Sequence, residues 1–151
     1  MSRHLKRSEE ERWRLREAVQ RQAITLEALS TPLIPLTNEI LVMPLIGTVD
    51  EQRSEQIIEA LLQGVIARRT RVAIVDITGI KTMDAAGVDG ILKAVKAVHL
   101  VGAEVVLTGI RPEVAQLLVA QGYDLSTIRT FGSLQNGIVY AMKRARGLAP
   151  G

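Results

Sequence analysis

The stretch VAIVDI at residues 72–77 decides the fold, and EVVLTG at residues 104–109 repeats its pattern. Continuous apolar runs of this length are typical of central strands that are covered on both faces. Between them, Asp84 is placed to cap a helix that continues to about Leu100, and Gly102 ends it. A strand, a helix and a second strand in this order predict a right-handed crossover within a parallel sheet.

The same alternation extends upstream of this central unit. The run ILVMPLI at residues 40–46 predicts a strand, in which Pro44 indicates an edge position or a bulge. A short strand at 33–36 is expected to pair with it through a turn. The segment GTVD at 47–50 is expected to end the strand, and Asp50 to cap a helix that continues through Arg69.

Downstream, the alternation continues to the C-terminus. Residues 78–83 are expected to form a loop, and Pro112 to open a helix that ends at Gly122. A short strand at 127–130 and a last helix, capped by Ser133, complete the pattern. The sequence therefore predicts an α/β fold with a mostly parallel central sheet and flanking helices.

The first 30 residues differ from the rest, because they are highly charged and contain no Gly or Pro. They predict one helix, which Pro32 and Pro35 end. Residues spaced four, three, four and three apart form the seam of a short coiled coil. These are Leu15, Val19, Gln22, Leu26 and Leu29. The helix either dimerises or packs on its own domain. We expect a linker or dimerisation helix at 1–30, a globular domain at 31–146 and a flexible tail at 147–151.

Composition excludes several classes of protein. The chain contains no cysteine, which rules out disulfides and thiolate metal sites. It contains no apolar run near the ~18 residues that span a bilayer and no signal-peptide core, so a cytoplasmic protein is expected. A net charge of +3, without a basic face or a known motif, argues against nucleic-acid binding.

Candidate chemistry is sparse, and we expect neither an enzyme nor a bound metal or cofactor. No nucleophile, base and acid can be assembled, and there is no phosphate-binding glycine loop. Three acids, Asp50, Asp76 and Asp84, come at or near the carboxyl ends of predicted strands, the usual functional edge of a parallel sheet. They are either helix caps or part of a metal or phosphoryl site, and the cap is the simpler interpretation for Asp50 and Asp84.

Several motifs, in order, carry a resemblance to a known family. They are STPLIP at 30–35, LIGTVD at 45–50, VDITGI at 75–80, LVGA at 100–103 and TGIRPE at 108–113. Over about residues 29–142 the chain resembles the STAS domain of the RsbR family. The related anti-sigma factor antagonists share the fold but fit less well.

The resemblance implies a partner-binding domain. RsbR-type proteins combine with RsbS-type STAS proteins in the stressosome, a cytoplasmic complex that sequesters an RsbT-type serine/threonine kinase. The N-terminal helix would match the linker from a sensor domain. This chain includes no sensor, which implies a short paralogue or a shortened piece. Two alternatives stay open: an antagonist that binds an anti-sigma kinase, and a STAS domain that binds a small ligand or nucleotide.

The resemblance also places two phosphoacceptor positions, where this sequence has Glu51 and Ala85. Neither side chain has a hydroxyl, so we expect the usual switch to be absent. Glu51 either imitates the modified state or is a favourable acid in the first turn of a helix. Substitute acceptors could be found among Thr48, Ser54, Thr78 and Thr82.

We expect two helix N-termini to meet at one edge of the sheet and to form a docking face for a partner. Small side chains there would leave the edge low and open. The residues expected in this face are Asp50, Glu51, Thr82, Asp84, Ala85, Ala86 and Gly87.

Overall fold

The structure is a computed structural model that describes residues 31–120, 122, 126 and 128–147. It divides into two units, residues 1–30 and 31–151, and every element below belongs to the second. The helix expected at residues 1–30, with its seam, lies outside the described residues. So does the tail beyond Gly147.

A five-stranded sheet, in the order β1-β2-β3-β4-β5, forms the centre of the second unit. The strand β1 (Ile34–Pro35) runs antiparallel to β2 (Ile40–Val49). The strands β3 (Val72–Met83), β4 (Glu104–Thr108) and β5 (Arg129–Phe131) each run parallel to their predecessor. The predicted α/β fold with a mostly parallel sheet is confirmed.

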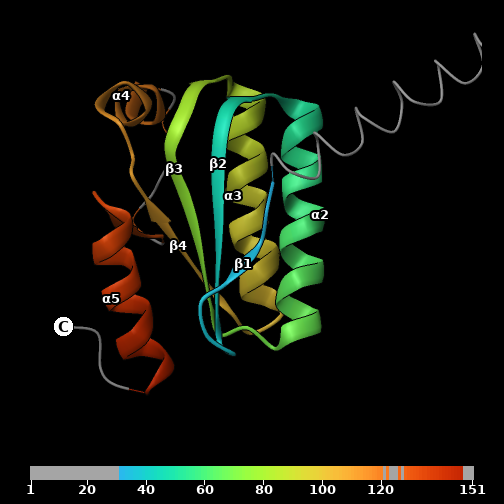
Figure 1. The fold of residues 1–151 in the computed structure, drawn as a ribbon. Helices are drawn as coiled ribbons and strands as arrows, with labels where there is room; N and C mark the ends of the chain where they lie inside the picture. Colours follow the sequence, from blue (N-terminus) through green and yellow to red (C-terminus); the bar gives the residue numbers. More distant parts are fainter. Residues whose placement is uncertain (1–30, 121, 123–125, 127, 148–151) are drawn as a thin grey trace, which may run out of the picture. The chain divides into compact units, whose positions relative to one another are not determined.

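Helices cover both faces of this sheet (Figure 1). The helices α2 (Glu51–Arg68) and α3 (Ala85–Leu100) lie side by side on one face, and α5 (Leu134–Ala145) lies on the other. The short α4 (Pro112–Ala120) packs its buried Val114 and Leu118 into the same core as α2 and α3. Among the described residues, no helix combines the length and apolar character needed to cross a bilayer.

Burial on both faces explains the apolar runs. In β2, Leu41 and Met43 belong to the core beneath α2 and α3, whereas Ile40 and Val42 belong to the core beneath α5. The strands β3 and β4 alternate in the same way. Because successive strand residues point to opposite faces, a strand between two helical layers needs apolar residues at every position.

The central strands are longer than predicted, and the prediction of a loop at residues 78–83 is wrong. These residues continue β3, and β2 likewise passes through Gly47 to reach Val49. The added strand pairs Gly79 to Met83 with Ile46 to Val49, after one register shift beside Pro44 and with a second between Gly47 and Thr48. In this part of β3, Thr78, Lys81 and Thr82 are exposed, whereas Ile80 and Met83 are buried. A polar composition therefore concealed a strand with one exposed face.

The prediction that Pro44 marks an edge position or a bulge is confirmed, because the residue lies at a bulge. It lies at the first register shift and beyond the two residues of β2 that pair with β1, so its missing N–H leaves no gap in that ladder.

Candidate partner-binding rim

The candidate site arises from the register of two parallel strands. The last paired residues of β2 and β3 are Val49 and Met83, so the next residues, Asp50 and Asp84, leave the sheet side by side. Each begins a helix at the upper end of the molecule in Figure 1. We call this surface the helix-tip rim: Thr48, Asp50, Glu51, Thr82, Asp84, Ala85 and Ala86, all exposed.

Both aspartates cap their helices, as predicted. Asp50 Oδ1 accepts a hydrogen bond of 2.8 Å from the amide of Arg53, and Asp84 Oδ1 accepts one of 2.7 Å from the amide of Gly87. Each cap satisfies an amide that has no partner within its helix and places negative charge at the positive end of the helix dipole. The rim therefore presents two capped helix N-termini with carboxylates already in place.

Gly87 lies inside the protein, beneath the exposed Ala85 and Ala86. A Cβ atom at this position would stand 2.3 Å from the carbonyl oxygen of Val49. One turn further, a Cβ on Gly90 would stand 2.2 Å from the Cβ of Ser54 on α2. The two glycines bring α3 against the end of β2 and the first turn of α2, which fixes the spacing of the two helix tips.

Arg53 supports the rim from below, and the sequence reasoning missed it. Its Nη1 donates to the carbonyl oxygen of Ile46 and, at 2.9 Å, to that of Thr48. Partial burial lowers the pKa of Arg53, an effect that nearby Asp50 opposes. The guanidinium thus satisfies strand carbonyls where β2 shifts register. A basic residue in the first turn of a helix opposes the dipole, and that conflict was the signal in the sequence.

The hydroxyl groups near the rim differ in accessibility. Thr82 Oγ1 lies 3.0 Å from Thr48 Oγ1, and both residues are exposed at the surface. Ser54 is only 3% exposed and donates to the carbonyl oxygen of Glu51 at 2.7 Å. Thr78 donates to Asp76 at 2.9 Å. Of the four candidate substitute acceptors, Thr48 and Thr82 are the two that lie on the rim.

Asp76 does not join the other two acids. It lies within β3, where its Oδ1 accepts hydrogen bonds from Thr78 Oγ1 and, at 2.7 Å, from Thr108 Oγ1 on β4. The bond from Thr108 ties β3 to its neighbour β4. Within the described part of the chain, no three His, Asp or Glu side chains are arranged to hold a metal ion.

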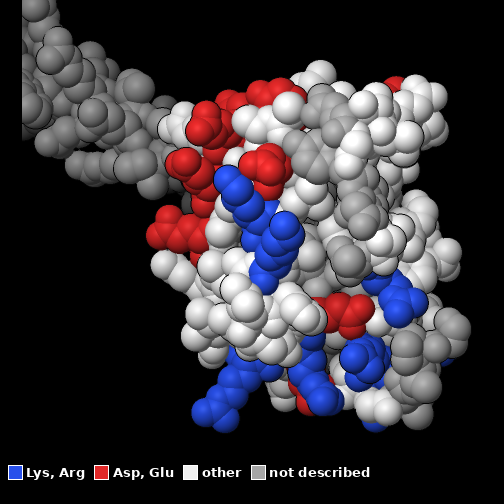
Figure 2. All heavy atoms as spheres, turned by 180° about the vertical axis from the view of Figure 1, so that it is seen from behind, with Lys and Arg blue, Asp and Glu red and all other residues white. Residues whose placement is uncertain are grey.

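Acidic side chains dominate the surface around the two helix tips. Figure 2 shows them gathered at the upper end of α2 and α3, with Lys and Arg beginning directly beside them and continuing to the lower end. Asp89 forms an ion pair of 3.2 Å with Lys93, one turn further along α3. The exposed acids near the tips are Asp50, Glu51, Glu55, Asp84 and Asp89. A partner that docks here meets negative charge on two helix ends.

Comparison with known families agrees with this geometry. The family model of the STAS domain matches residues 31–137. The chain therefore belongs to the STAS domain family.

Similar proteins define the branch of that family more closely. The chain is 46% identical over 127 residues to the RsbT co-antagonist protein RsbRA of Bacillus subtilis, a match covering 84% of this chain and 46% of that protein. It is 28% identical to an RsbS variant from Moorella thermoacetica, with a TM-score of 0.67 over 77% of this chain and 97% of that one. A chain from a stressosome structure matches at 25% identity and a TM-score of 0.62, covering 76% of this chain and 99% of that one.

The resemblance to RsbR proteins is thus confirmed, and the fold is that of the anti-sigma factor antagonists. The chain spans less than half the length of RsbRA.

Proposed function

We propose that this chain is a non-enzymatic protein-binding module of the RsbR type, and that the helix-tip rim is its docking face. Its partners are an RsbS-type STAS protein, an RsbT-type serine/threonine kinase, or both, in the cytoplasm. The observation that carries the proposal is the exposure of Glu51 and Ala85 on adjacent helix tips. The name of the similar RsbRA, a co-antagonist of RsbT, supports the choice of partners.

The rim in this proposal is a docking face without the usual chemical switch. The family resemblance places acceptors at residues 51 and 85, where a carboxylate and a methyl group stand. A phosphate would add close to two negative charges and three acceptor oxygens, whereas Glu51 adds one charge. Partner binding is then constitutive with respect to these two positions.

Phosphorylation by an RsbT-type kinase with ATP tests the loss of the switch, with intact-mass measurement as the readout. We expect no phosphate on the wild-type chain and one phosphate on Ala85→Ser, because the serine would stand exposed at the acceptor position. Ala86→Ser, one residue further, is the matched control and should stay unmodified. Phosphate on Thr48 or Thr82 of the wild type would contradict the proposal.

Docking itself is tested by native mass in the presence of an RsbS-type protein. The wild type should form a large complex, and Ala85→Arg should not, because a long cation would stand on the low, acidic part of the rim. Ala67→Arg, exposed near the other end of α2, is the control and should assemble normally. If both variants assemble equally well, the docking face lies elsewhere on the molecule. Binding only to an anti-sigma kinase would favour the antagonist alternative.

A further inference from the structure

A second site lies where β3 and β4 begin, at the opposite end of these strands from the helix-tip rim. It is a hollow of about 490 Å³, and its polar lining comes from α3, β4, β5 and α5 and from Arg71, which directly precedes β3. We call it the arginine pocket. Its polar lining residues are Arg71, His99, Glu104, Arg129, Tyr140 and Arg144.

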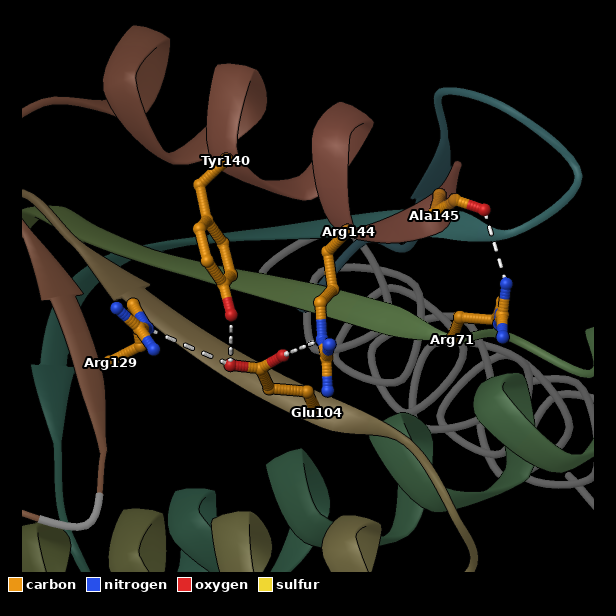
Figure 3. A network of polar contacts seen from close by, with 6 residues as sticks. All are labelled: Arg71, Glu104, Arg129, Tyr140, Arg144 and Ala145. Atoms are coloured by element: carbon orange, nitrogen blue, oxygen red, sulfur yellow. Dashed lines mark hydrogen bonds and ion pairs between the residues drawn. The ribbon is translucent and has the colours of Figure 1, made fainter. Parts of the chain in front are cut away.

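Glu104 organises this pocket (Figure 3). Its Oε1 accepts a hydrogen bond of 2.7 Å from the Tyr140 hydroxyl, and its Oε2 accepts one of 3.3 Å from Arg144 Nε. Arg129 Nε lies 4.0 Å from the same carboxylate, and its guanidinium carbon stands 4.8 Å from the centre of the Tyr140 ring. One carboxylate therefore holds two guanidinium groups in place around the hollow.

The third guanidinium belongs to Arg71, which enters from the start of β3. Its Nη1 donates to the carbonyl oxygen of Ala145 at 3.1 Å and lies 3.9 Å from Glu39. Each arginine carries five N–H donors. Within the described residues, the contacts of Arg71, Arg129 and Arg144 occupy only some of these donors. Three guanidinium groups are thus set against two carboxylates, Glu104 in the lining and Glu39 beside Arg71, so the pocket keeps a net positive charge and unused donors.

We propose that the arginine pocket binds a phosphate-bearing small molecule. Guanidinium groups match phosphate oxygens with paired N–H donors, and three of them from separate elements suit a tetrahedral dianion better than a flat carboxylate. The volume lies within the range of small-molecule sites. Tyr140 is only 7% exposed and Arg129 stands over its ring, so the ring is unavailable for stacking. Recognition therefore rests on the phosphate group. The site is independent of the helix-tip rim and goes beyond partner docking.

Titration calorimetry on the full chain tests the proposal, with inorganic phosphate, a sugar phosphate and a nucleoside monophosphate as probes. At least one probe should bind saturably at millimolar concentration or below. Arg129→Gln and Arg144→Gln should each weaken that binding by about tenfold or more, because each removes charged hydrogen bonds. Lys96→Gln removes the same charge from the exposed face of α3 and should leave binding unchanged.

The variant Glu104→Gln tests whether the arginines of the pocket bind a ligand or only stabilise the fold. The amide can still accept from Tyr140, but the negative charge that competes with the ligand is gone, so phosphate should bind more tightly. A purely structural network predicts the same direction of change for Glu104→Gln and Arg144→Gln, and the proposal predicts opposite directions. Circular dichroism checks that each variant is folded. If Arg144→Gln does not fold, Arg144→Lys takes its place. Absence of saturable binding, or binding of an acidic peptide in place of all three phosphates, would overturn the proposal.

Discussion

At the scale of single residues, Gly87 is a position where the fold leaves no room for a side chain. A Cβ there would meet backbone, the carbonyl oxygen of Val49, and backbone cannot move aside as a flexible side chain can. We expect Gly87→Ala to lower the free energy of unfolding by about 2 kcal/mol or more, as overpacking does. Urea denaturation measures the change.

The control for this substitution is Gly132→Ala. A Cβ at Gly132 meets nothing within 4 Å, and its backbone is not in the left-handed region. We expect this variant to be neutral or slightly more stable, since alanine restricts the unfolded chain. Equal losses in both variants would show that the close approach at Gly87 is unimportant.

Tyr140 gives the fold a dependence on alkaline pH. Burial, assisted by the hydrogen bond to Glu104, raises the pKa of this phenol above its ordinary value. The folded state therefore favours the protonated form. Its contribution is complete below about pH 10, where the unfolded tyrosine begins to ionise, and is lost as pH rises through the higher folded value.

The measurement compares wild type with Tyr140→Phe by urea denaturation between about pH 8 and about pH 11. We expect the stability advantage of the wild type to be constant at the lower pH values and to shrink at the higher ones. A stability difference between the wild type and Tyr140→Phe that is the same at every pH would rule out this linkage.

At the scale of elements, the two aspartate caps combine a structural task with the surface charge of the rim. Asp50→Ala and Asp84→Ala should each cost about 1 kcal/mol, because an amide loses its acceptor. Asparagine keeps an acceptor at the cap, so Asp50→Asn and Asp84→Asn should lose less and retain most of the stability. Thermal unfolding of the four variants checks this, and Asn variants as unstable as the Ala variants would refute the cap.

How far the sequence predicts these elements depends on where their partners lie. The caps at Asp50, Asp84 and Ser133 were predicted because each bonds an amide three residues away. The ends of β2 and β3 were not predicted. Their hydrogen bonds join two strands that are distant in sequence, and these bonds form only after a register shift.

The same reasoning applies to the two sites. The helix-tip rim could be anticipated because local motifs bring Asp50 and Asp84 to strand ends. The arginine pocket could not, because Glu104 meets Tyr140 and Arg144 across separations of 36 and 40 residues. No local spacing marks such a set, and charged residues of this kind usually lie singly on a surface.

At the scale of the whole molecule, both hydrophobic cores belong to the sheet and its helices. A chain that begins at Thr31 should therefore fold by itself and unfold cooperatively on heating. We propose that residues 1–30, with the seam at Leu15, Val19, Gln22, Leu26 and Leu29, dimerise the intact chain. Native mass should then be that of a dimer for the intact chain and of a monomer for the shortened one. Equal oligomeric states would end the dimerisation proposal.

The outer side of β2 has a consequence for self-association. The strand β1 pairs with only two residues of β2, so within the described residues the outer side of β2 beyond Val42 has no strand partner. There Pro44 has no N–H to offer a foreign strand, and Arg53 already occupies the carbonyl oxygens of Ile46 and Thr48. An edge proline and carbonyl groups that are already occupied protect a sheet from ladder growth and amyloid-like stacking. A chain whose edge is protected in this way can reach high local concentration without its sheets fusing, because neighbours must recognise side chains rather than bare peptide.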